Sequence, residues 1–309
     1  MESENVVSLE TCIDEFLVYI ESVRCLSPNT VSSYREDFHH LTLCLEKNIP
    51  VKNITAEDLR NCIASLSKRN YSVLSINRFI SAVRSLFAYC KRYGYIPFNF
   101  ALEIKTLRAP ACVPRYMSPA EIDGICNAAQ ENPLLWGARD KAIFEMFYSS
   151  GCRVSEMTSL ELNDFREDFS SAVVTGKGRK DRIVYFEKDA REALFKYLYE
   201  RKKRFPVTWF DGACPVNKIF VNQKGNALSQ CGIRYIVSSY SGPEGINHHV
   251  SPHAFRHTFA TAMLANGADI RVVQEMLGHN SISTTQRYTH LTTQQLKDIY
   301  FQSHPHSGE

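Results

Sequence analysis

Apolar and polar positions alternate along the first hundred residues with the spacing of helices. Apolar side chains recur every three or four residues over residues 9–23 and again over residues 28–47, so each set lies on one helix face. Residues 55–68 and 72–94 continue the pattern. Four amphipathic helices of this length predict a small all-α domain over residues 1–108. The first two stripes are formed by Leu9, Ile13, Phe16, Leu17, Ile20, Val31, Tyr34, Phe38 and Leu41.

Capping residues mark the ends of these helices. Ser27 stands where an N-cap is expected, and Pro28 occupies the first helical position. Thr55 and Asp58 form a variant of the capping box, in which each side chain binds the other residue's backbone N–H. Gly94 follows the last apolar residue of its stretch and is typical of a helix C-terminus.

A second domain is predicted to follow a short linker. Pro110 and Pro114 interrupt any helix over residues 109–117. The sequence Ser118-Pro119-Ala120-Glu121 is a capping box that restarts a helix, so the second domain spans residues 118–309. The β-branched runs at 172–175 and 183–186 flank a glycine-rich turn and predict a hairpin. The expected fold class is therefore mainly α, with a small β-hairpin in the C-terminal domain.

Composition narrows the classes of function. The ten cysteines include no C-x-x-C pair, which argues against a zinc ribbon or a thioredoxin-type site. No stretch approaches the ~20 apolar residues of a membrane span, and the N-terminus lacks the apolar core of a signal peptide. Scattered thiols without an export signal indicate the reducing cytoplasm. We therefore expect a cytoplasmic protein with no membrane association and no metal site.

Positive charge is concentrated in one part of the helical domain. Between Asp58 and Glu103 the sequence has no acidic residue. Such a stretch is also typical of a solvated helix face, but its single sign favours a polyanionic partner. The candidate DNA-binding residues are Lys68, Arg69, Arg78, Arg84, Lys91 and Arg92.

Histidine and arginine recur in the second domain at positions suited to binding a phosphate. His253 and Arg256 fall three apart at the start of a helix, where the unpaired N–H groups also attract anions. Arg153 begins another helix after the turn predicted at Ser149, Ser150 and Gly151. Each pattern alone is equally typical of a helix start on the surface, and Arg153 could simply pair with Glu156.

Three further residues complete the candidate set. Lys177 lies between two glycines in the hairpin turn, which is not a phosphate-cradling P-loop but could present a mobile charge. Gly278 ends a helix opened by Asp269, so His279 lies at a turn between helices. Tyr288 follows in a polar stretch, where a tyrosine is expected to present its hydroxyl rather than pack in a core.

The series resembles the tyrosine recombinase family of site-specific DNA recombinases, and its Xer-type branch. The segments "GCRVSE", "VTGKGRKDR", "HAFRHTFAT" and "LGHNSISTTQRYTH" match in order, and "LSPNTVSSYREDF" with "SINRFISAVRSLFAYC" resembles the N-terminal core-binding domain. The sequence departs from the pattern at Tyr185, where proline is frequent, and at Phe100, in "FNFA". The resemblance implies a SAM-like helical domain and an α+β catalytic domain that together clamp DNA.

The resemblance also implies a role for each candidate. Tyr288 would attack the scissile phosphate and form a 3′-phosphotyrosyl bond. Fixed donors would neutralise the charge of the transition state, and Lys177 would protonate the leaving 5′-oxygen. No metal or other cofactor is expected, because arginines supply the positive charge. The implied catalytic set is Arg153, Lys177, His253, Arg256, His279 and Tyr288.

The implied partner is a double-stranded DNA recombination site. The protein would act as a homo- or hetero-tetramer, with a paralogous recombinase and a division-associated DNA translocase as further partners. Resolution of chromosome or plasmid dimers is the expected role. A mobile-element integrase, a type IB topoisomerase and a non-catalytic DNA-binding protein are the alternatives. The apolar stripe of Leu296, Ile299 and Tyr300 predicts a tail helix that docks on a neighbouring protomer or on its own domain.

Overall fold

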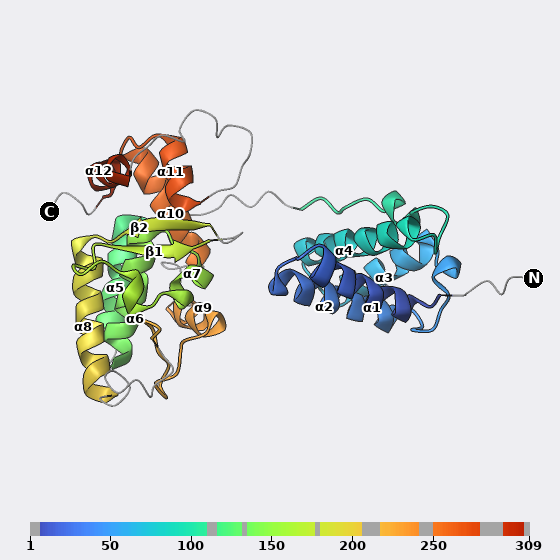
Figure 1. Ribbon diagram of the computed structural model, residues 1–309, viewed down its shortest axis with the longest axis horizontal. Helices are drawn as coiled ribbons and strands as arrows, with labels where there is room; N and C mark the ends of the chain where they lie inside the picture. The colour runs from blue at the N-terminus through green and yellow to red at the C-terminus, as the bar shows by residue number, and fades with distance from the viewer. Residues whose placement is uncertain are drawn as a thin grey trace, which may run out of the picture. The chain divides into compact units, whose positions relative to one another are not determined.

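The protein consists of two compact units, Met1–Cys112 and Val113–Glu309. The computed structural model describes residues 7–109, 116–131, 135–176, 180–205, 217–240, 250–278 and 293–305 (Figure 1). Each unit has its own hydrophobic core. Over the described stretches the structure is mainly helical, as the sequence predicts, and none of these helices is long and apolar enough to cross a membrane.

The first unit is a bundle of helices, as the apolar stripes predict. Phe16 lies near its centre, with edge-on ring contacts to Phe38 and Tyr89 at centroid separations of 5.7 and 5.5 Å. Such pairs stabilise a core beyond the area they bury. The helices are α1 (Leu9–Val18), α2 (Pro28–Cys44), α3 (Ala56–Lys68) and α4 (Val73–Arg92), with a π-helical turn at Tyr19–Val23 and 3-10 turns at Val51–Asn53 and Phe100–Glu103.

The helix ends of this unit follow the capping residues. The Ser27 hydroxyl accepts a hydrogen bond from the Thr30 N–H at 3.2 Å, at the start of α2. The Thr55 N–H donates to the Asp58 carboxylate at 2.9 Å, and the Asp58 N–H donates back to the Thr55 hydroxyl. Gly94 adopts a left-handed φ of +79° just beyond α4. The sequence was sufficient to predict these helix ends because each cap joins residues only a few positions apart.

The second unit is built around α6 (Leu135–Ser150), which packs against α5 (Pro119–Glu131), α8 (Lys188–Arg204) and α10 (Pro252–Ala265). The stacked rings of Phe144, Phe147 and Phe255 join α6 to α10 in the buried core. In Figure 1, α10, α11 and α12 lie together, coloured orange to red. The other helices are α7 (Val154–Ser159), α9 (Gln230–Ser239), α11 (Ile270–Leu277) and α12 (Thr293–Ser303), with a 3-10 turn at Leu162–Asp164.

Strands β1 (Ser171–Thr175) and β2 (Asp181–Tyr185) form the predicted hairpin. They pair antiparallel, with Thr175 opposite Asp181 and Val174 opposite Arg182. The capping box at Ser118 and Glu121 is present at the start of α5. One local prediction was wrong: Ser149 and Ser150 are the last residues of α6 rather than part of a turn. The chain reverses one residue later, at Gly151, whose φ is +58°.

The tail helix α12 packs on its own domain. Tyr300 is 1% exposed and lies against Tyr185 and Phe259, at centroid distances of 5.3 and 6.4 Å. Its hydroxyl donates to the Ser149 carbonyl at 2.9 Å. The ring and the hydroxyl of Tyr300 are thus both buried within its own domain, and docking of the tail on a neighbouring protomer stays a prediction.

Candidate active site

Arg153, at the start of α7, is held by hydrogen bonds from both its backbone and its side chain. Its backbone N–H donates to the Glu156 carboxylate at 2.7 Å, and its guanidinium donates to the same carboxylate at 2.7 Å. The remaining Nη2 donates to the Gly278 carbonyl at 3.0 Å. The side chain is 27% exposed, so it is only partly buried by these contacts.

Glu156 is the buried centre of this cluster. Arg182, on β2, donates to both of its carboxylate oxygens, at 2.7 and 2.8 Å. Burial by itself would raise the pKa of Glu156, but the hydrogen bonds and charge of Arg182, with the N–H and side chain of Arg153, lower it to about 2. Glu156 is therefore ionised at neutral pH and fixes the orientation of two arginines.

Arg256 enters the same region from the first turns of α10. Its guanidinium donates to the Gly151 carbonyl at 2.6 Å and to the Leu277 carbonyl at 2.5 Å. Burial and the neighbouring charge of Arg153 lower the pKa of Arg256 to about 10. It remains cationic at neutral pH. Among the described residues, Glu156 is the carboxylate whose charge opposes this lowering of the Arg256 pKa.

Gly151 and Gly278 allow these backbone carbonyls to approach the arginines. Both glycines have left-handed φ values, +58° and +65°. A Cβ on Gly151 would lie 2.6 Å from Cδ1 of Phe259, so a side chain there would displace the α10 core. Gly278 ends α11, and its carbonyl is fixed by Arg153. The chain therefore reaches residue 279 from a fixed point beside the arginines.

The hairpin turn also begins beside the cluster. A Cβ on Gly176 would lie 3.5 Å from the Glu156 Oε1 and 3.6 Å from the Arg182 Nη1. The Gly176 N–H donates to the Lys180 carbonyl at 2.8 Å, which closes the base of the turn. Gly176, the last described residue before position 177, is therefore held next to Glu156.

The structure brings together two of the predicted catalytic residues, Arg153 and Arg256. His253 is exposed at the second position of α10, three residues before Arg256. Lys177, His279 and Tyr288 lie outside the described residues. Over the described ranges no group of three or more His, Cys, Asp or Glu side chains is arranged to hold a metal ion.

Sequence reasoning missed two members of the cluster. Glu156 was considered only as a surface partner for Arg153, although it is 1% exposed and binds two arginines. Arg182 was not recognised, although it lies within the segment "VTGKGRKDR". Its position on β2, opposite Val174, and its bond to the Met276 carbonyl at 2.8 Å connect the hairpin to α11. No local pattern signals a contact between strands and helices this distant in sequence.

The described cluster is suited to binding an anion. Arginines offer planar pairs of donors that match phosphate oxygens. A site with fixed cations can neutralise charge that develops in a phosphoryl-transfer transition state without reorganising. The Glu156 carboxylate keeps Arg153 and Arg182 aligned before any ligand arrives.

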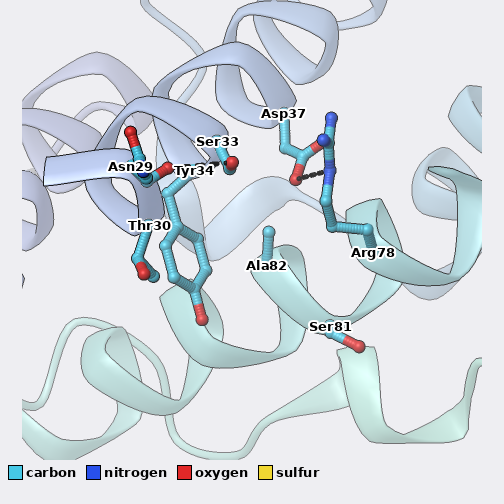
Figure 2. A pocket seen from close by; sticks show the side chains of 8 residues that line it. All are labelled: Asn29, Thr30, Ser33, Tyr34, Asp37, Arg78, Ser81 and Ala82. Carbon is cyan, nitrogen blue, oxygen red and sulfur yellow. Dashed lines mark hydrogen bonds and ion pairs between the residues drawn. The ribbon is translucent and has the colours of Figure 1, made fainter. Parts of the chain in front are cut away.

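The first unit contains a pocket of about 360 Å³ that is lined by residues of α2 and α4. Figure 2 shows Arg78 joined to Asp37 at one side of it and Asn29 with Thr30 at the other. Arg78 donates to Asp37 at 3.0 Å and to Glu36 at 3.2 Å, and Asp37 is 2% exposed. Burial raises the pKa of Asp37, although its bonds to Arg78 oppose that shift. Arg78 therefore stabilises this unit's own fold as well as facing the pocket.

The remaining basic candidates differ in how they are held. Lys68, Arg69 and Lys91 are exposed, and Arg92 is exposed while donating to the Tyr19 hydroxyl at 3.3 Å. Arg84 is half-buried and donates to the Ile104 carbonyl. The exposed residues are thus available to a polyanion, whereas Arg84 ties α4 to the end of the unit.

Comparison with known proteins identifies both units. Residues 115–295 match the phage integrase family, and residues 13–94 match its N-terminal SAM-like domain. The chain is 39% identical over 300 residues to tyrosine recombinase XerC of Treponema denticola, covering 95% of this chain and 98% of the relative. It is 33% identical over 296 residues to tyrosine recombinase XerD of Listeria monocytogenes, covering 95% and 98%.

A solved structure agrees at the level of the fold. A lambda integrase tetramer bound to a Holliday junction matches with a TM-score of 0.70 and 18% identity, over 93% of this chain and 82% of that one. The two family matches together cover most of the chain and define the class, a phage integrase domain preceded by an N-terminal SAM-like domain. The chain belongs to the phage integrase family and is a tyrosine recombinase, a site-specific enzyme that cleaves and rejoins DNA through a tyrosine intermediate.

Proposed function

We propose that Tyr288 is the nucleophile of this recombinase. Its hydroxyl oxygen attacks the scissile phosphorus and the bond to the 5′-oxygen breaks, which leaves a 3′-phosphotyrosyl bond and a free 5′-hydroxyl. The tyrosine proton is lost and the leaving oxygen gains one, so the step needs a base and an acid. An ordinary tyrosine pKa near ~10 means that a cationic pocket must assist ionisation.

Arg153 and Arg256 hold the nonbridging oxygens of the phosphate in this proposal. The observation that carries it is their convergence: Arg153 binds the Gly278 carbonyl and Arg256 binds the adjacent Leu277 carbonyl. Both guanidiniums therefore lie at the end of α11, from which the chain continues toward His279 and Tyr288. The nucleophile and the phosphate ligands are connected through one short stretch of backbone.

Lys177 and the two histidines complete the proposed chemistry. Lys177 directly follows Gly176, which lies beside Glu156, and in this proposal it donates the proton to the 5′-oxygen. His253, exposed at the N-terminus of α10, and His279 donate hydrogen bonds to the phosphate or accept the tyrosine proton. Rejoining is the reverse step, in which a 5′-hydroxyl from the partner DNA attacks the phosphotyrosyl bond. No metal and no nucleotide is required for either direction.

Both domains bind DNA in this proposal. Residues 1–108 form the core-binding domain, residues 109–117 the linker, and residues 118–309 the catalytic domain with its tail helix. Lys68, Arg69, Lys91 and Arg92 contact the phosphate backbone through their exposed charges. Arg78 and Arg84 add positive charge to the same domain, although each also has a partner within it.

The recombinase acts as a tetramer on double-stranded DNA, and it resolves chromosome or plasmid dimers at cell division in the cytoplasm. Similarity to both XerC and XerD proteins over nearly the whole chain supports a paralogous partner in that tetramer. A division-associated DNA translocase is the expected activator. Strand exchange between two marked duplexes, with and without the paralogue, tests the assembly.

A trapped covalent adduct tests the chemistry. A duplex nicked close to the cleavage site loses the fragment that carries the 5′-hydroxyl, so the phosphotyrosyl protein accumulates. The wild-type protein should form an adduct that survives denaturation, and Tyr288→Phe should form none while it binds the duplex equally well. An adduct of undiminished yield with Tyr288→Phe would assign the nucleophile to another residue.

A further inference from the structure

Three arginines from three elements donate to consecutive backbone carbonyls at the C-terminal end of α11. The last carbonyls of a helix have no partner within it and carry the negative end of its dipole, so guanidinium groups are favourable there. The donors come from β2, α10 and the start of α7, and they fix the end of α11 to all three. The pairs are Arg182 with Met276 at 2.8 Å, Arg256 with Leu277 at 2.5 Å and Arg153 with Gly278 at 3.0 Å.

All three guanidinium nitrogens of Arg182 donate to protein acceptors. Nε donates to the Met276 carbonyl, and Nη1 and Nη2 donate to the Glu156 carboxylate at 2.7 and 2.8 Å. The side chain is 12% exposed. A planar fork of donors can bind a carboxylate with two nitrogens and a carbonyl with the third, which a lysine ammonium cannot do. Arg182 is therefore suited to holding its neighbours in place rather than to binding the DNA phosphate.

The guanidinium of Arg182 also lies beside two glycines that precede proposed catalytic residues. A Cβ on Gly176 would lie 3.6 Å from the Arg182 Nη1, and a Cβ on Gly278 would lie 3.6 Å from the same nitrogen. Lys177 follows the first glycine and His279 follows the second. Consecutive Cα atoms are only ~3.8 Å apart, so a displacement of either glycine is passed to the residue that follows it.

We propose that Arg182 is a positioning residue of the recombinase, an inference that rests on the roles proposed above for Lys177 and His279. Its guanidinium holds the two glycines against the carboxylate that orients Arg153. Arg182 does not touch the phosphate, but it sets where the general acid and the histidine stand when the phosphate binds. Cleavage therefore depends on the forked shape of its side chain as well as on its charge.

The variant Arg182→Lys separates shape from charge, because it keeps the cation but has a single nitrogen. Single-turnover adduct formation is measured on a duplex with an ordinary scissile phosphate and on one with sulfur in place of the leaving 5′-oxygen. Misplacement of the general acid should slow the ordinary substrate about 10²-fold. The sulfur substrate leaves without protonation, so it should be slowed less than about tenfold. Affinity for the duplex should be unchanged, because Arg182 does not contact a phosphate.

Controls distinguish this inference from the proposed function on which it rests. Arg234 is exposed on α9, so Arg234→Lys should cleave both substrates as the wild type does. Lys177→Ala is measured on the same pair of substrates. If Lys177→Ala recovers on the sulfur substrate and Arg182→Lys does not, Arg182 does not position Lys177 and the inference is wrong. If Lys177→Ala is slow on both, the role proposed for Lys177 is wrong, and hydrogen exchange decides on Arg182.

Hydrogen exchange of the full-length protein is independent of the role of Lys177. The Gly176 N–H donates to the Lys180 carbonyl at 2.8 Å, and the Gly278 N–H donates to the Glu275 carbonyl at 2.9 Å. Arg182→Lys should lose protection at both glycine amides, while α5 and α8 keep the protection of the wild type. Unchanged protection at both amides would overturn the inference. A loss spread evenly over the second unit would also overturn it, because Arg182 would then stabilise the whole unit rather than position these two segments.

Discussion

Glu156 binds Arg182 through both carboxylate oxygens, at 2.7 and 2.8 Å, while the same buried carboxylate holds Arg153. Burial would raise the pKa of Glu156, but hydrogen bonds and charge from the two arginines lower it to about 2. The stability that the ionised carboxylate contributes therefore depends on pH. The effect is complete above the ordinary pKa of 4.5 and is lost as the pH falls toward 2.

Replacing this acid should lower the stability of the catalytic domain. The shift from 4.5 to about 2 corresponds to roughly 3 kcal/mol, so Glu156→Gln should lower the free energy of unfolding by about that amount at pH 7. Both tryptophans, Trp136 and Trp209, belong to the second unit, so their fluorescence during urea unfolding measures it. The difference from wild type should shrink between pH 4.5 and pH 2. Glu167→Gln, on the surface, is the control, and a constant difference across that range would contradict the interpretation.

Gly151 should tolerate no side chain. Gly151→Ala combines a left-handed φ with a Cβ only 2.6 Å from Phe259, so both backbone strain and overpacking contribute, roughly 2–5 kcal/mol together. Gly267→Ala is the matched control, because its φ is +90° but no atom lies within 4 Å of its Cβ. It should lose only the strain, about 1–2 kcal/mol. Equal losses of stability for the two variants would show that Phe259 moves aside without cost.

Lys177 should be dispensable when the leaving group needs no proton. Lys177→Ala is expected to slow cleavage of an ordinary phosphodiester by around 10²–10⁴-fold. A substrate with sulfur in place of the 5′-oxygen leaves without protonation, so the variant should cleave it at nearly the wild-type rate. Single-turnover cleavage of both substrates measures the effect. Equal slowing on the two would give Lys177 another role, such as positioning the phosphate.

Arg78 and Lys68 should affect different quantities. Arg78→Ala leaves Asp37 buried beside Glu36 without its cation, and should lower the free energy of unfolding of the first unit by about 1–3 kcal/mol. Calorimetry should show that the double variant Asp37→Asn, Arg78→Ala recovers part of the lost stability.

Lys68→Ala should leave the free energy of unfolding unchanged and reduce the slope of log DNA affinity against log salt concentration by about 0.9. An unchanged slope would show that Lys68 does not contact a DNA phosphate.

Local features could be predicted from the sequence, and features that join distant segments could not. Thr55 with Asp58, Ser118 with Glu121 and the helix end at Gly278 each depend on neighbours within a few residues, and all are present. The pairing of Glu156 with Arg182 depends instead on the hairpin returning a strand to α7. The absence of acidic residues between Asp58 and Glu103 identifies a basic stretch of sequence. It does not reveal that Asp37, on another helix, forms an ion pair with Arg78. Likewise, the apolar stripe of α12 predicted burial without specifying the surface.

The fixed ends on either side of residues 279–292 define a tether for the proposed nucleophile. Arg153 anchors the chain at Gly278, and Tyr300 anchors α12, both on the same domain. Tyr288 stands ten residues beyond Gly278 and twelve before Tyr300, so the length of the covalent chain alone limits its distance from each of these anchors.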